Sequence, residues 1–166
     1  MDIEAAVRAA LEATGVPFEL LACDPDYADT AAFCQRYGFS PEQSVNTIVV
    51  AGKAEPKRYV ACAVAASTRL DVNGTVRRRL DVKRASFATA DETRDLTGMM
   101  IGGVTALALP AAVPLWVDER VMALPEIILG GGSRSLKVKV SPTVFVHLPN
   151  TSVVPGLATT PTASAA

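Results

Sequence analysis

The chain of 166 residues predicts a single domain of the α+β class. Helical and strand-like segments follow one another without a strict strand–helix–strand alternation, and this order favours a mixed sheet over a doubly wound parallel one. Apolar residues make up 49% of the chain and aromatic residues only 5%, so the core must be mainly aliphatic. No internal repeat is visible.

The N-terminal residues predict a helix, a strand and a second helix. Residues 2–14 place apolar side chains on one helical face, Asp2 is a typical N-cap, and Gly15 can end the helix in a left-handed conformation. Residues 17–23 are mostly apolar and short enough for a strand. The next helix is expected over residues 29–38, which end in a glycine.

The middle of the chain predicts a β-hairpin. Residues 45–51 and 59–66 are rich in Val and Ala, and the polar residues 53–58 separate them, as in two antiparallel strands joined by a turn. A weak helix, a short strand and a well-capped helix are expected next, at residues 70–81, 82–88 and 89–98.

The last part of the chain predicts a loop, a strand and a second hairpin. The loop spans residues 99–110, the strand residues 114–118, and the hairpin residues 126–140 around three consecutive glycines. Residues 141–149 fit a helix and a strand about equally. From residue 150 the chain is small, polar and rich in Pro and Thr, which predicts a folded domain over residues 1–149 and a flexible tail over residues 150–166.

The charge balance excludes a strong overall attraction to nucleic acid. The chain has 16 basic and 17 acidic residues, so a polyanion would have to be held by a local patch. The most apolar run is broken by Pro110 and Pro114, and the N-terminus lacks a signal peptide. Cys23, Cys34 and Cys62 show no C-x-x-C spacing. We therefore expect reduced, mostly buried thiols in a cytoplasmic protein without a metal site or membrane contact.

Asn46 and a pair of glycines are candidate site residues. Asn46 opens an apolar strand, where its amide needs hydrogen-bond partners; it is either a satisfied strand-end residue or part of a site. Gly102 and Gly103 either form an ordinary loop or bring backbone N–H groups close to a ligand.

Basic residues cluster in one segment. Arg77, Arg78 and Arg79 form the densest positive run; they are either a solvated helix face or a contact with the phosphate backbone of a nucleic acid. His147, the single histidine, lies in an apolar segment near the C-terminus, and we expect it to be a surface or structural residue.

The order of several motifs resembles the YbaK family. These are "LDV" after a strand, "ADETRDLTG" followed by "GGV", "VPLWVDERV" and "SLKVKVSP". This family includes the editing domain inserted in bacterial prolyl-tRNA synthetases and free-standing aminoacyl-tRNA deacylases. The resemblance extends over about residues 2–148.

The resemblance implies a fold and an activity. The fold would be a mixed, strongly curved sheet of six to seven strands, closing toward a barrel with flanking helices. The activity would be hydrolysis of the ester that joins a wrong amino acid to the 3′-terminal ribose of tRNA. The expected partner is aminoacyl-tRNA, with an aminoacyl-tRNA synthetase as a further candidate, and the family is expected to need no metal and no cofactor.

Two motif positions depart from the family pattern. The family has a lysine followed by Thr and a β-branched or Leu residue, whereas this chain has Asn46 before Thr47. Its substrate loop has the form G-x-x-x-P, and here Gly102 is kept while Ala106 stands in place of the proline. The resemblance therefore implies Asn46, Gly102 and Gly103 as catalytic positions, and Thr47 and Ala106 as substrate-binding positions. The basic run adds Arg77, Arg78 and Arg79 as further candidate substrate-binding residues.

The loss of the charged lysine leaves two functions open. The chain is either a deacylase, with activity reduced by Asn46, or a non-catalytic module that binds a tRNA end, a nucleotide or a synthetase. A neutral hydrogen bond is weaker than a charge-assisted one by about 1–2 kcal/mol. Lys53, the nearest lysine, lies at the other end of the same predicted strand, roughly 23 Å away.

Overall fold

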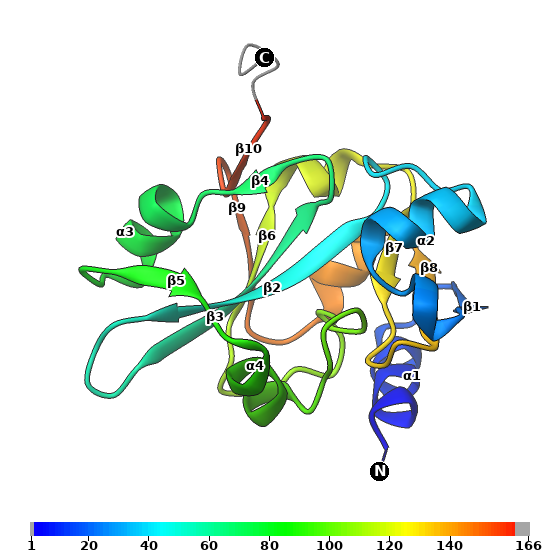
Figure 1. Cartoon of the computed structure of the whole chain (residues 1–166), viewed down its shortest axis with the longest axis horizontal. Coiled ribbons are helices and arrows are strands. Elements are labelled where there is room, and N and C mark those ends of the chain that lie inside the picture. The colour runs from blue at the N-terminus through cyan, green and yellow to red at the C-terminus, as the bar shows by residue number, and fades with distance from the viewer. Residues whose placement is uncertain (1, 162–166) are drawn as a thin grey trace.

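Two sheets, joined by a single β-bridge, form the frame of the structure (Figure 1). The structure is a computed structural model and describes residues 2–161. The α-helices are α1 (Ile3–Thr14), α2 (Thr30–Tyr37), α3 (Arg77–Leu80) and α4 (Ala90–Thr97). The helical turns of other types are η1 (Pro25–Tyr27), η2 (Val72–Val76), η3 (Glu119–Ala123) and η4 (Pro142–His147). The strands are β1 (Phe18–Ala22), β2 (Val45–Gly52), β3 (Arg58–Ala65), β4 (Arg69–Leu70), β5 (Ala85–Phe87), β6 (Leu115–Asp118), β7 (Ile127–Gly130), β8 (Leu136–Val140), β9 (Thr151–Val154) and β10 (Ala158–Thr159).

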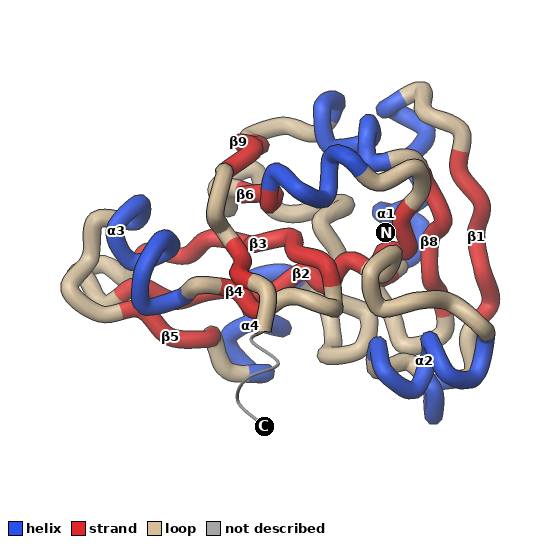
Figure 2. Tube along the Cα trace, turned by 90° about the horizontal axis from the view of Figure 1, so that it is seen from above, coloured by secondary structure: helices blue, strands red, loops and turns tan. Residues whose placement is uncertain are grey.

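The larger sheet has the strand order β5-β2-β3-β6-β9. The predicted hairpin forms its centre, because β2 and β3 pair antiparallel along their whole length. β6 joins β3 in parallel, and β9 joins β6 in parallel. The smaller sheet has the antiparallel order β1-β8-β7. Figure 2 shows β1 and β8 running across the direction of β2 and β3.

The α+β class is confirmed, but the barrel-like sheet is not. The predicted strands 45–51, 59–66 and 114–118 lie in the larger sheet, whereas the two strands of the predicted hairpin 126–140 lie in the smaller one. Closure would require β7 to continue pairing with β2. Instead the Ser44–Ile128 bridge, just before β2, is the only pairing between the two sheets among the described residues, so neither sheet is closed.

The predicted tail contains ordered strands. β9 pairs with β6 along all four of its residues, and β10 pairs with β4. Val154 is 3% exposed and Leu157 is fully buried. The folded part thus continues past residue 149. Three of the four residues of Thr151–Val154 are β-branched and favour a strand, although the composition of the surrounding segment suggests disorder. Residues 162–166 of the predicted tail lie outside the described residues.

Local sequence signals explain the well-predicted helices. The Asp2 side chain accepts a hydrogen bond from Ala5 N at 2.9 Å, and Gly15 ends α1 with a φ of 72°. Thr89 and Glu92 form a reciprocal capping box at α4. The weak helix at 70–81 resolves into η2, a π-helical turn, followed by α3. The ambiguous segment after residue 140 contains η4.

Two apolar clusters enclose the larger sheet. One, which includes Val45, Ala61 and Val117, packs against α1, the smaller sheet and η4; the other, which includes Val50, Cys62 and Trp116, packs against η2, α3 and the β4–β10 pair. All three cysteines are free and buried, and burial raises the pKa of Cys62 to about 12. Within residues 2–161, no helix is long and apolar enough to cross a membrane.

Candidate functional site

A pocket of about 380 Å³ lies where the two sheets part, between β2 and β7. The start of α2, the loop around Gly102, and the end of β5 complete its walls. The side chains and backbone that line it include Ala28, Asp29, Thr30, Phe33, Asn46, Thr47, Val49, Phe87, Ile101, Gly102, Val104, Gly130 and Lys137. The failure of the sheets to close into a barrel is therefore what leaves this space.

One wall of the pocket is the open edge of β2. β2 pairs with β5 only from Val50 onward, although it pairs with β3 over its full length. Val49 O accepts a hydrogen bond from Ala88 N at 2.9 Å, on the β5 side. Alternate residues of an antiparallel strand direct their backbone groups to the same side, so the N–H and C=O of Thr47 face the unpaired edge.

Thr47 also has a hydroxyl without a partner. Its side chain is 7% exposed, and its Oγ1 makes no hydrogen bond within the described chain. A buried hydroxyl without a partner costs free energy of about 1–3 kcal/mol. Thr47 is thus a position at which a ligand could satisfy both backbone and side-chain groups.

Asn46 lines the pocket. It is half-buried, and its Oδ1 accepts a hydrogen bond from Thr30 Oγ1 at 2.6 Å. Its Nδ2 donates to no acceptor among residues 2–161. The strand-end interpretation thus accounts for the oxygen of the amide, and the two N–H donors remain available.

Lys137 of β8 brings a positive charge into the pocket. Its side chain is 6% exposed, and its Nζ donates hydrogen bonds to Ala28 O at 2.6 Å and to Gly102 O at 2.8 Å. The ammonium also lies 5.5 Å from the centre of the Phe33 ring. Burial lowers the pKa of Lys137 below its ordinary value of 10.5.

The sequence analysis did not identify Lys137. Lys137 and Lys139 occupy alternate positions of β8 between apolar residues, a pattern that places both lysines on one face. Lys139 is partly exposed there and pairs with Glu19 and Glu126. The two lysines differ because the Ala28 segment and the Gly102 loop pack over Lys137 alone. This tertiary packing cannot be predicted from the local sequence pattern.

Gly102 is required where the loop passes the pocket. Its φ is 93°, and a Cβ there would lie 2.2 Å from Nη1 of Arg134. That guanidinium donates to Ile101 O at 3.0 Å and to the Asp29 carboxylate at 3.1 Å. Lys137 and Arg134 therefore hold this loop against the start of α2.

Gly103 has a different position from its neighbour. Its N–H donates to Met100 O at 2.9 Å, and its C=O accepts from Gly132 N at 2.7 Å. A Cβ on Gly103 would lie 2.4 Å from the backbone carbon of Ser133. Gly103 thus packs behind the pocket and offers no free N–H to a ligand.

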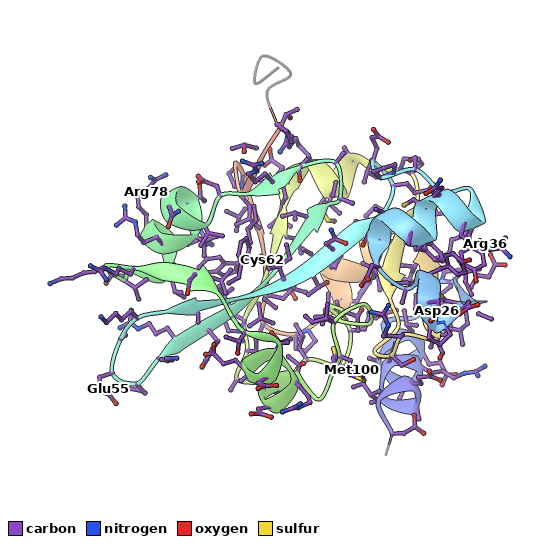
Figure 3. The ribbon with its side chains drawn as sticks, in the orientation of Figure 1. Asp26, Arg36, Glu55, Cys62, Arg78 and Met100 are labelled. Atoms are coloured by element: carbon purple, nitrogen blue, oxygen red, sulfur yellow. The ribbon has the colours of Figure 1, made fainter. Side chains whose placement is uncertain are left out.

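The remaining predicted residues do not gather at the pocket. Ala106 is 3% exposed, belongs to the apolar core and does not line the pocket. Arg79 lies 5.2 Å from the ring centre of Trp116. Arg78 is exposed on α3, at the end of the molecule opposite to Arg36 of α2 (Figure 3). Arg77 lines a separate groove. His147 is exposed, as expected.

Comparisons with known proteins identify one matching family model and solved structures with the same fold. The family model described as the aminoacyl-tRNA editing domain matches residues 24–148. The crystal structure of "hypothetical protein APE2540" is similar at 24% identity and a TM-score of 0.81, covering 92% of this chain and 99% of the other. The crystal structure of "a putative trans-editing enzyme for prolyl tRNA synthetase" is similar at 24% identity and a TM-score of 0.79, covering 96% of this chain and 98% of the other.

Proposed function

Because the chain belongs to the aminoacyl-tRNA editing domain family, we propose that it is a trans-acting deacylase that hydrolyses the ester of a mischarged tRNA. The observation that carries this proposal is the state of the Lys137 ammonium. An ammonium has three N–H donors. The carbonyls of Ala28 and Gly102 occupy two of them, so the third is free for an oxygen of a bound substrate.

The geometry supports a simple division of roles. Water adds to the ester carbonyl carbon, the bond from that carbon to the ribose oxygen breaks, and a proton passes to the ribose oxygen. The products are a free amino acid and a tRNA with a free 3′-terminal hydroxyl. The negative charge that develops on the carbonyl oxygen is stabilised by Lys137, whose charge acts strongly because it is buried.

The unpaired edge of β2 would hold the aminoacyl group. The backbone C=O of Thr47 can accept a hydrogen bond from the α-amino group of the substrate, and the Asn46 amide can donate to its oxygens. These contacts use parts that all amino acids share. Discrimination among amino acids then falls to the side-chain walls of the pocket, which admit small groups and exclude larger ones.

A binding module without catalysis is the second candidate, and one observation favours it. The titratable side chains that line the pocket, among the described residues, are Asp29 and Lys137. Asp29 is paired with Arg134 at 3.1 Å, so it is poorly placed to act as a free general base. A deacylase built from these residues would depend on the substrate's own hydroxyl to assist the attacking water.

Deacylation assays separate the two candidates. The purified protein is incubated with tRNAs charged with each small amino acid, and Lys137→Met is compared with the matched variant Lys139→Met on the same strand. We expect hydrolysis of at least one charged tRNA. We also expect loss of about 10- to 100-fold in rate for Lys137→Met, since a hydrogen bond to a charged group contributes about 1.5–3 kcal/mol.

Lys139→Met is the control, because Lys139 pairs with Glu19 and Glu126 outside the pocket. It should keep the native rate within about twofold. If no charged tRNA is hydrolysed but the native protein binds tRNA, the deacylase proposal is wrong and the chain is a binding module. Equal rate losses in the two lysine variants would contradict the role of Lys137.

A further inference from the structure

A second hollow, which we call the basic groove, lies at the far end of β2 from Asn46. It has a volume of about 660 Å³ and is formed by the β2–β3 turn, the η2–α3 segment, β5 and α4. The β2–β3 turn, α3 and β5 lie on the left in Figure 1 and α4 lies below the middle, whereas α2 and β7 lie on the right. Its charged lining residues are Lys53, Lys57, Arg77, Lys83, Arg84 and Glu92.

The cations of the basic groove are mostly unpaired. Lys53, Lys83 and Arg84 are exposed, and none forms an ion pair with a carboxylate in the part of the chain that the structure describes. Lys57 pairs with Glu92 at 3.2 Å. Since the whole chain has a formal net charge of −1, the basic groove is a local concentration of positive charge. Such a concentration attracts a polyanion.

Glu92 offsets one of the positive charges of the basic groove, that of Lys57. Its carboxylate accepts hydrogen bonds from Thr89 N at 3.1 Å, Tyr59 Oη at 2.8 Å and Lys57 Nζ at 3.2 Å. The Thr89 N–H, the Tyr59 hydroxyl and the Lys57 ammonium lower the pKa of Glu92 to about 2. The carboxylate is therefore ionised but committed to the α4 cap and to the β3 side of the groove.

The pocket and the basic groove follow one another along β2, without sharing a lining residue. β2, β5 and α4 each contribute residues to both. Val49 lines the pocket and Lys53 lines the basic groove, and the strand between them spans roughly 13 Å. One extended ligand can therefore occupy both without leaving the edge formed by these three elements.

An exposed aromatic ring stands at the junction. Phe87 of β5 lines the pocket and is 59% exposed, and its neighbour Ser86 lines the basic groove. Exposed aromatic rings beside a positive groove are typical of proteins that bind single-stranded nucleic acid, because bases stack on the ring while cations follow the phosphates.

We propose that the basic groove binds the phosphates of a single-stranded RNA 3′ end, with a base stacked on Phe87 and the terminal residue in the pocket. This inference rests on the proposed function, which places the aminoacyl end of tRNA in the pocket. A polyanion is favoured over a single phosphate ion because the cations come from the β2–β3 turn, the η2–α3 segment and the residues leading into β5, so that they are spread over several elements.

The test uses uncharged RNA, so that binding is measured without hydrolysis. The probes are a labelled RNA hairpin with a four-nucleotide single-stranded 3′ overhang and the same hairpin with a blunt end. Dissociation constants are measured by fluorescence anisotropy at several salt concentrations. We expect the double variant Lys83→Ala/Arg84→Ala to weaken binding of the overhang RNA about tenfold or more and to reduce the salt slope by about 1.4, at about 0.7 per phosphate contact.

Phe87→Ala tests stacking separately. It should weaken binding of the overhang RNA about 5- to 100-fold with an unchanged salt slope, because a ring carries no charge. Arg8→Ala is the matched control, since Arg8 is an exposed cation of α1, which lies away from the basic groove. It should bind both hairpins as the native protein does.

The outcomes distinguish this inference from the proposed function. The proposed binding of a single-stranded 3′ end would be wrong if the groove variants bind the overhang RNA as tightly as Arg8→Ala does, or if they lose affinity equally for the blunt hairpin. Either result would overturn it even if mischarged tRNA is hydrolysed. A loss of affinity for the overhang RNA alone would support binding of the single-stranded 3′ end in the basic groove. This holds even if no charged tRNA is hydrolysed, in which case only the deacylase proposal fails.

Discussion

At the residue scale, one buried ammonium defines the chemistry of the pocket. Lys137 is held by two backbone carbonyls and the Phe33 ring, with no carboxylate hydrogen-bonded to it among the described residues. A buried charge without a counter-ion is costly for folding. Retention of such a group in a pocket is common for functional residues, which often have shifted pKa values.

The lowered pKa of Lys137 predicts a pH dependence of folding stability. Below that pKa the ammonium is present in both states, so the residue adds no slope. Between that pKa and the ordinary value of 10.5, the unfolded chain binds more protons, so the free energy of unfolding rises with pH by at most about 1.4 kcal/mol per unit. Lys137→Met lacks this contribution.

Urea unfolding of native protein and Lys137→Met between pH 7 and 10.5 measures the effect. The stability of the native protein relative to the variant should be constant at first and then increase with pH. A relative stability that falls with pH would mean that the ammonium is stabilised, rather than penalised, by its surroundings.

Asn46 allows a second prediction at this scale. We expect Asn46→Lys to raise deacylation about 5- to 30-fold, because a charged donor strengthens a hydrogen bond to the transition state by about 1–2 kcal/mol. If Lys137 and a lysine at position 46 serve the same oxygen, Asn46→Lys should also restore much of the activity lost in Lys137→Met. Rates of the two single variants and the double variant test this.

Asn46→Gln is the matched control, since it lengthens the side chain without adding charge. If Asn46→Gln raises the deacylation rate as much as Asn46→Lys does, the effect comes from the length of the side chain and not from its charge. No gain in either variant would mean that the neutral amide of Asn46 is already sufficient.

At the scale of elements, the helices and strands that could be predicted from the sequence are those fixed by interactions between residues close together in the chain. α1 and α4 begin and end at caps that lie within a few residues of the chain, so their sequences identify them. The β2–β3 hairpin is equally local. By contrast, the buried state of Lys137 depends on Ala28 and Gly102, which are distant in sequence. The pairing of β9 with β6 is likewise invisible to a local pattern.

The ordered C-terminal strands give a third prediction. A chain that ends at Asn150 loses the burial of Val154 and Leu157 and exposes the edge of β6. Burial of one such side chain contributes about 1.5–3 kcal/mol, so we expect the free energy of unfolding to fall by at least about 3 kcal/mol. Thermal and urea unfolding measure this.

A chain that ends at Pro161 is the control and should retain native stability, because it keeps β9 and β10. Native stability in the chain that ends at Asn150 would show that the domain folds without these strands.

At the scale of the whole molecule, the site is a product of how two sheets meet. The sequence allowed the α+β class to be predicted, but the angle between sheets is set by packing across many elements. The bridge from Ser44 to Ile128 joins them at one point, beyond which α2 and the Gly102 loop fill part of the gap. What remains is the pocket, with the basic groove beyond it along β2.

The open edge of β2 has a consequence for how such a pocket evolves. Its hydrogen-bonding groups at Thr47 belong to the main chain, and a point mutation to any residue other than proline leaves the N–H and the C=O in place. If the pocket binds an aminoacyl group, as we propose, a descendant of this protein can change its amino-acid preference by altering Phe33, Val104 or Ile101 on the other walls. The main-chain contacts to the part that all aminoacyl groups share would be kept.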